Sequence, residues 1–197
     1  MVRVQDFGVS VKPGVLNPNP YPPTPDTLNT NIHPAALTAE ELIAQCDVRR
    51  LRRSGPGGQH RNKVETAIVL HHRATGVKAE ASERRSQAEN RSVALFRLRL
   101  NLALRVRNAR RPEKAPSRLW QSRSAGGRIS VNPSHDDFPV LIAEALDAVD
   151  AVDADAKRAA ESLGCTVSQL VKLLKKEPRA MVLVNEWRSR RGLHALQ

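Results

Sequence analysis

The sequence predicts an α+β protein, in which a small mixed β-sheet with one long packed helix is followed by a small all-α module. Three observations support this prediction. Two β-rich runs, 66–72 and 77–81, flank a turn signal at 74–76. Apolar residues recur at helical spacing between Ser86 and Asn108. From Val140 onward, four segments in a row carry helical patterns.

The segment before the sheet is rich in proline. Seven of the 13 prolines fall between Pro13 and Pro34, a composition that cannot bury enough apolar surface to fold alone. Thr38 is expected to cap a short helix, and 47–52 to form a strand. The predicted units are a disordered segment (1–36), a loop-bearing domain (37–111), a linker (112–134) and a helical module (135–197). Within the linker, Trp120 and 129–131 are candidate anchors.

The long helix predicted at 86–108 has an apolar stripe and a basic remainder. The stripe recurs at i, i+4 and i+7 and consists of Ala94, Leu95, Leu98, Leu102 and Val106. The basic side chains are Arg91, Arg97, Arg99, Arg105 and Arg107, and no acidic residue follows Glu89 in this helix. These arginines fit either a solvated helix face or a surface that contacts RNA.

The four helical patterns of the module cover 140–152, 155–163, 168–176 and 179–191. The second and third resemble a helix-turn-helix unit, which is a common packing unit and also a DNA-binding motif. Residues 135–161 carry a net charge of −6 and residues 165–197 a net charge of +5. We expect these opposite blocks to neutralise each other in a compact helical bundle.

The net charge of +12 points to a polyanionic partner. Between Val48 and Arg111 there are 17 Lys and Arg against 4 Asp and Glu, a net charge of +13, which favours RNA phosphates. One Tyr and three Phe argue against base stacking on an aromatic sheet. No apolar run approaches the roughly 20 residues that cross a membrane. Cys46 and Cys165 lack metal-ligand spacing, so we expect no metal and a reducing, cytoplasmic compartment.

The stretch from Arg52 to Lys63 must contain a loop, because three glycines and a proline fall within 55–58. A glycine pair lets the backbone approach a ligand closely and leaves N–H groups free to face it. Arginine and lysine flank the loop on both sides, so the ligand is expected to be an anion.

This loop, at 54–67, resembles the Gly-Gly-Gln loop of class I peptide chain release factors. A second block, Thr75-Gly76-Val77 followed by Arg-Ser-Gln-Ala-Glu-Asn-Arg at 85–91, is similar to the same domain at the family's spacing. The resemblance covers about Val48 to Arg107. It implies hydrolysis of the ester bond of peptidyl-tRNA in the peptidyl-transferase centre of the large ribosomal subunit.

The resemblance also implies roles for single residues. Gly57, Gly58 and Gln59 are the catalytic candidates, and Gln59 is a candidate for modification. Positions that pack the loop base or touch rRNA are Arg53, Arg61, Asn62, Lys63, Arg84, Arg85, Ser86, Gln87, Asn90 and Arg91. Asn62, Ser86, Gln87 and Asn90 are also suited to caps and loop hydrogen bonds. The expected partners are the large subunit with its rRNA and peptidyl-tRNA, with no cofactor, and the chain is expected to be a monomer.

The chain looks like a short, codon-independent relative that rescues stalled ribosomes or separated large subunits, because only about 47 residues precede the match and most are proline linker. Its basic last helix is expected to bind rRNA, tRNA or a ribosomal protein. Two alternatives stay open. One is a non-catalytic protein that binds the ribosome or RNA, and the other is a DNA-binding regulator that uses residues 155–191.

Overall fold

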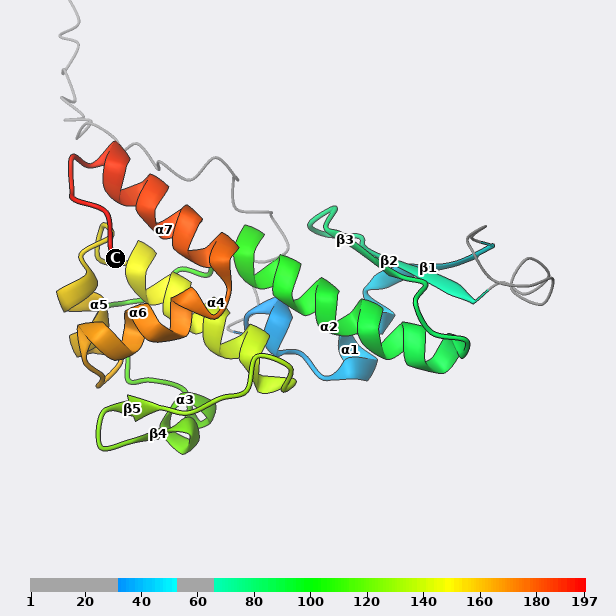
Figure 1. Ribbon diagram of the computed structural model, residues 1–197, viewed down its shortest axis with the longest axis horizontal. Helices are drawn as coiled ribbons and strands as arrows, with labels where there is room; N and C mark the ends of the chain where they lie inside the picture. The colour runs from blue at the N-terminus through cyan, green and yellow to red at the C-terminus, as the bar shows by residue number, and fades with distance from the viewer. Residues whose placement is uncertain (1–31, 53–65) are drawn as a thin grey trace, which may run out of the picture.

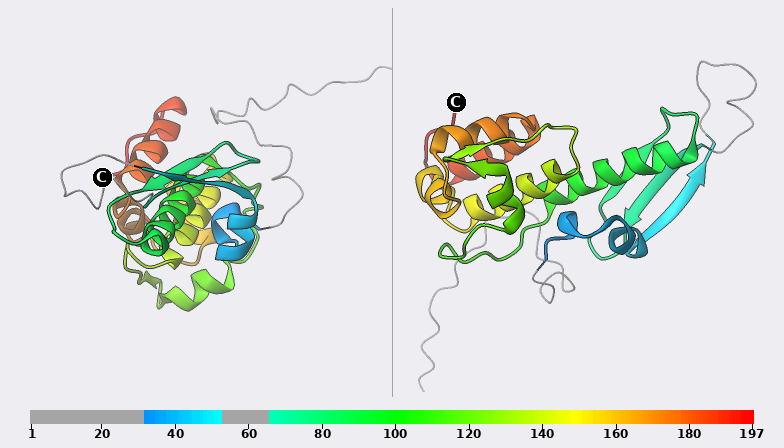
Figure 2. Two further views of the ribbon diagram at one scale, coloured as in Figure 1. Left: turned by 90° about the vertical axis from the view of Figure 1, so that its right-hand side faces the viewer. Right: turned by 90° about the horizontal axis from the view of Figure 1, so that it is seen from below.

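The computed structural model describes residues 32–52 and 66–197. At one end of this part lies a three-stranded sheet, made of β1 (Cys46–Leu51), β2 (Ala67–His72) and β3 (Lys78–Ala81). Helices gather at the other end, and α2 (Gln87–Arg105) runs between the two (Figures 1 and 2). Over the described ranges, no helix has both the length and the apolar character needed to span a bilayer.

The α+β class is confirmed, with one correction to the sheet. It was expected to be mixed, but its order is β1-β2-β3 and both pairings are antiparallel. The reason for the β2–β3 direction is the short turn after His72, where Gly76 has a φ of +67°. Parallel neighbours need a crossover of about a dozen residues or more, which this turn cannot supply.

Helix α2 forms as its pattern predicts. Ser86 caps it by accepting a hydrogen bond from the Glu89 backbone N–H, and Ala94, Leu98 and Leu102 are fully buried. One side of α2 packs on β2 and β3, and another packs on α4 (Asp137–Asp150). The helix therefore contributes to the core at both ends of the molecule.

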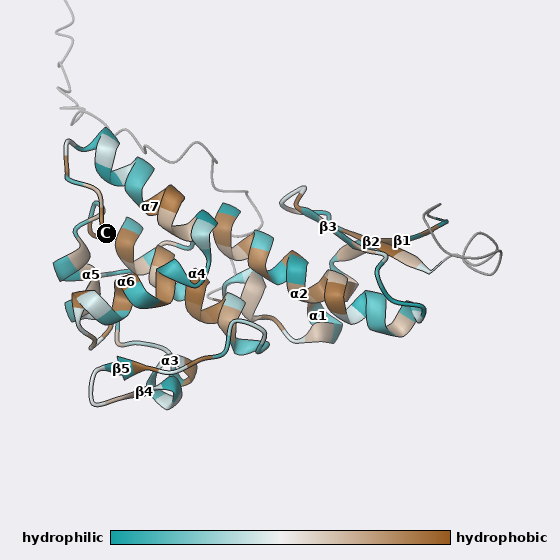
Figure 3. Cartoon of the chain, viewed as in Figure 1, coloured by the Kyte–Doolittle hydropathy of each residue, from teal (hydrophilic) through white to brown (hydrophobic). Residues whose placement is uncertain are grey.

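The three remaining predicted helices are α5 (Ala156–Ser162), α6 (Val167–Lys175) and α7 (Pro178–Arg190). All four helices of the module are confirmed to within a few residues. The buried residues form one continuous core, which extends from Ala35 to Trp187. Figure 3 shows hydrophobic residues on α2, α4 and α6 where these helices come together.

Residues 112–134 contain α3 (Arg118–Arg123) and a small hairpin of β4 (Ser124–Ala125) and β5 (Arg128–Ile129). The predicted anchors Trp120 and Val131 are both buried, and the Trp120 indole N–H donates to the Leu163 carbonyl at 2.9 Å. This stretch is thus packed on the helices. The division of the chain into domains stays a prediction.

The chain segment before β1 also packs against the core. Thr38 and Glu41 form a capping box at the start of α1 (Ala39–Ala44), as expected from Thr38. A short 3-10 helix, η2 (Pro34–Ala36), lies within the segment that was predicted to be disordered, and Pro34 and Ala35 are buried. Residues 1–31 lie outside the described residues.

Candidate functional site

Seven of the predicted site residues lie outside the described residues: Gly57, Gly58, Gln59, Arg53, Arg61, Asn62 and Lys63. What the structure describes is the frame that carries this segment. Leu51, the last residue of β1, pairs with Ala67, the first residue of β2. Paired positions in antiparallel strands lie about 5 Å apart between Cα atoms. The loop segment therefore leaves and re-enters the sheet at one place.

Asn90 ties the end of the loop segment to the chain that leads into α2. Its Nδ2 donates to the carbonyl oxygens of Thr66, at 2.7 Å, and Arg84, at 2.9 Å. Its Oδ1 accepts from the Arg84 backbone N–H at 2.9 Å. The residue has no exposed surface. Of the two roles expected for Asn90, packing of the loop base is the one this position allows.

Three predicted cations surround the start of α2. Arg84, Arg85 and Arg91 are exposed, and within the described ranges their side chains have neither a hydrogen bond nor an ion pair. They lie beside the N-terminal end of α2, where the helix dipole adds further positive potential. Ser86 serves as the helix cap, the alternative considered for it, and Gln87 is half-buried. The result is a cationic surface next to the loop base.

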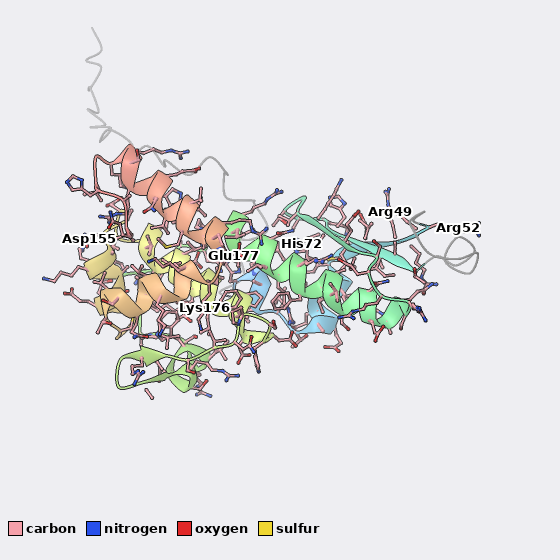
Figure 4. All side chains as sticks on the ribbon, viewed as in Figure 1. Arg49, Arg52, His72, Asp155, Lys176 and Glu177 are labelled. Carbon is pink, nitrogen blue, oxygen red and sulfur yellow. The ribbon has the colours of Figure 1, made fainter. Side chains whose placement is uncertain are left out.

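Sequence reasoning did not single out Arg49 and Arg50 of β1. Both are exposed on a strand that leads directly into the loop segment. Figure 4 shows Arg49 on this strand and Arg52 directly after its end. The signal that could have identified them is their position in a strand ending at a charged loop. With Arg84, Arg85 and Arg91, they place cations on two sides of the loop base.

The described residues near the loop base suit anion binding better than proton transfer. Glu83, the nearest acidic residue to this cluster along the chain, contacts the Arg97 guanidinium. The hydrogen bond from Arg97 lowers the pKa of the Glu83 carboxyl group. Glu83 is therefore an ionised partner of an arginine and not a proton donor at neutral pH.

Arg107, one of the five arginines predicted to face solvent or RNA, is instead buried. It forms an ion pair with Asp147 of α4 at 3.0 Å, and its guanidinium lies 5.8 Å from the centre of the Trp187 ring. Arg110 pairs with Glu144 of the same helix at 3.4 Å. The acidic side chains of α4 thus neutralise arginines that directly follow α2, and not chiefly the arginines of the basic last helix.

Comparison with known proteins matches residues 40–133 to the model of the RF-1 domain. Peptide chain release factor 2 of Acidovorax sp. (strain JS42) is 38% identical over 82 residues, which are 42% of this chain and 20% of that protein. Peptide chain release factor 1 of Acidiphilium cryptum (strain JF-5) is 35% identical over 97 residues, 48% of this chain and 28% of that protein. The matched region is therefore less than a third of each relative.

Proposed function

We propose that this chain, which belongs to the class I peptide chain release factor family through its RF-1 domain at 40–133, hydrolyses the ester bond of peptidyl-tRNA on the large ribosomal subunit. The observation that carries the proposal is Gly57-Gly58-Gln59 in a segment whose two ends are held together where β1 ends and β2 begins. The cations around this place match the phosphates of the surrounding RNA.

In the proposed reaction, water attacks the ester carbonyl and a tetrahedral oxyanion develops. Its collapse breaks the bond to the tRNA 3′ oxygen, which leaves as a hydroxyl with a proton from the attacking water, and the peptide leaves as the carboxylic acid. The backbone N–H of Gln59 donates a hydrogen bond to this oxyanion, and the two glycines give the backbone the conformational freedom to reach it. The Gln59 side chain orders the attacking water. Positioning of the ester and water by the RNA site supplies much of the acceleration, so the chain needs no acid–base pair.

The frame of the loop has its own role in this proposal. Asn90 donates two hydrogen bonds and accepts one, and these three bonds hold Thr66 and Arg84 together, which fixes the loop base relative to α2. Arg84, Arg85 and Arg91 contact rRNA phosphates, so the same helix end that orients the loop also docks it.

We propose further that release does not depend on a stop codon and that the substrate is a stalled ribosome or a separated large subunit. The support is the stretch Gly-Pro-Gly-Gly-Gln at 55–59, in which the proline before the glycine pair resembles the short, codon-independent relatives.

The catalytic proposal is tested by peptide release from ribosomes loaded with labelled peptidyl-tRNA. Gly58→Ala is expected to abolish release and Gln59→Ala to slow it or to admit larger nucleophiles such as hydroxylamine. Ser54→Ala, in the same segment, is the matched control and should release at the wild-type rate. Full release by both Gly58→Ala and Gln59→Ala would overturn the catalytic role of this segment, whereas no release by the wild-type chain would support a non-catalytic ribosome-binding protein instead.

Codon independence is tested with the wild-type chain on four substrates. These are ribosomes with an empty decoding site, a sense codon or a stop codon, and isolated large subunits that carry peptidyl-tRNA. We expect release without a stop codon. Release only at stop codons would overturn codon independence and leave the hydrolase proposal intact, whereas no release from any substrate would overturn both.

A further inference from the structure

The β4–β5 hairpin packs on helix α6 and forms one unit with it at the helical end of the molecule. The hairpin turns at Gly126 and Gly127, which have φ values of +57° and +73°. The Ile129 backbone N–H donates to the Gln169 side chain at 3.4 Å, and Lys176 Nζ donates to the Val131 carbonyl at 2.5 Å. Gln169 of α6 and Lys176, which directly follows α6, therefore hold the hairpin.

Helix α6 and the hairpin together carry three exposed cations. Ser168, Lys172 and Lys175 follow one another at i, i+4 and i+7, and all three are exposed. Arg128 is exposed at the tip of the hairpin. In the described ranges, Arg128, Lys172 and Lys175 have no side-chain hydrogen bond or ion pair. We call these four residues the hairpin–α6 face.

Acidic residues are missing from the segments that build this face. There is no Asp or Glu between Lys114 and His135, nor between Gly164 and Lys176. Several acids of the module are engaged elsewhere, Glu144 and Asp147 with arginines beyond α2 and Asp137 with Arg123. Part of the negative charge of 135–161 is thus already paired with arginines outside α6.

Helix α7 offers a poorer surface, although it was expected to be the binding element. Arg179 contacts Glu177 and Asn101, Arg188 donates to the carbonyls of Ala154 and His194, and Arg191 pairs with Asp153. Binding through these arginines would require breaking contacts within the fold. Arg128, Lys172 and Lys175 have no such contacts to break in the part of the chain that the structure describes.

We infer that the hairpin–α6 face binds the phosphate backbone of double-stranded RNA. A protein partner would call for an apolar centre, but none of the exposed large hydrophobic residues, which are Ile32, Val48, Leu51, Val182 and Leu193, belongs to this face. Ser168 is the one uncharged exposed side chain on α6, so the helix has few polar groups that could form hydrogen bonds with base edges. This argues against a sequence-specific DNA regulator. The choice of RNA over DNA rests on the proposed function.

This second contact lies at the opposite end of α2 from the loop base. Helix α2 has 19 residues, a length of about 28 Å, and it lies between the sheet and the helical end. A chain held by RNA at both ends has a fixed orientation. The hairpin–α6 face therefore selects RNA surroundings that present a duplex away from the ester.

The test measures binding of the full chain to a labelled RNA duplex of about 20 base pairs by fluorescence anisotropy over a range of salt concentrations. The test variant is K172A/K175A, and the matched control is K157A/R158A. The control removes the same charge from exposed positions of α5, where alanine is equally compatible with a helix. Far-ultraviolet circular dichroism confirms that both variants fold.

Each phosphate contact contributes about 0.9 to the slope of log affinity against log salt, so K172A/K175A should lower the slope by about 2. At 0.1 M salt this corresponds to an affinity loss on the order of 60-fold, and the control should bind within about twofold of wild type. Unchanged binding by K172A/K175A, or an equal loss in the control, would overturn the proposal.

A DNA duplex of the same sequence decides between nucleic acids. We expect weaker binding to DNA than to RNA; tighter binding to DNA that is lost in K172A/K175A would overturn the choice of RNA. This binding assay does not depend on peptide release. Its failure is therefore distinguishable from failure of the proposed hydrolase activity.

Discussion

His33 lies buried against the end of α2, and its two ring nitrogens have opposite roles. Nδ1 accepts a hydrogen bond from the Ala35 backbone N–H at 3.0 Å, and Nε2 lies 3.1 Å from the Val106 carbonyl oxygen, which can only accept. The folded protein therefore holds a neutral imidazole with its proton on Nε2. Burial, together with the nearby positive charge of Arg107, lowers the pKa of His33 to about 3.

The unfolded chain has no such constraint, and its histidine titrates near 6.5. Between about pH 6.5 and pH 3 the unfolded state binds a proton that the folded state excludes. The contribution of His33 to stability is complete above pH 6.5 and falls by about 1.4 kcal/mol for each pH unit below it. At pH 5 the loss is about 2 kcal/mol.

Urea unfolding at pH 7.5 and pH 5.0 measures this effect. His33→Asn keeps an acceptor for the Ala35 N–H but does not titrate, so wild type should lose about 2 kcal/mol more than His33→Asn between the two pH values. Subtracting the free energy of unfolding of His33→Asn from that of wild type at each pH cancels the contribution of the titratable groups that both proteins share. His194→Asn, at an exposed histidine, is the control and should behave as wild type. An equal loss in wild type and His33→Asn would refute the reasoning.

Three further substitutions test the frame. Asn90→Ala leaves three backbone groups without their partner and should lower the free energy of unfolding by about 2–4 kcal/mol, and it should slow peptide release even where the protein is folded. An unchanged melting temperature would contradict this. Trp120→Ala should cost about 3–5 kcal/mol in urea unfolding, because the ring is 1% exposed and anchors 112–134; a loss below about 1 kcal/mol would show that this stretch is not held by it. Gly164→Ala should lower the free energy of unfolding by about 1 kcal/mol, because Gly164 has a φ of +63° just after α5. Ser189→Ala, at an exposed position of α7, is the control and should leave the melting temperature in a thermal scan unchanged.

Local patterns were sufficient for most of the secondary structure. The apolar period of 86–108 predicted α2, and proline and glycine signals limited α7 and the β2–β3 turn, because these residues restrict the backbone whatever surrounds them. The capping box at Thr38 is likewise a contact within one turn. Recognition of the Gly-Gly-Gln loop also needed only the order of residues, since the motif is contiguous in the chain.

The sequence by itself determined the elements, the loop and the excess of positive charge, while the tertiary structure decided where that charge is available. Arg107 reads as a surface residue of a basic helix, yet it is buried against Asp147, 40 positions away. The pattern of one helix cannot reveal a partner brought by another, because ion pairing depends on distance in space and not along the chain. The same holds for Asn90, whose bond to Thr66 spans 24 positions, and for Glu144 and Asp147 of α4, whose charges pair with arginines from another part of the chain.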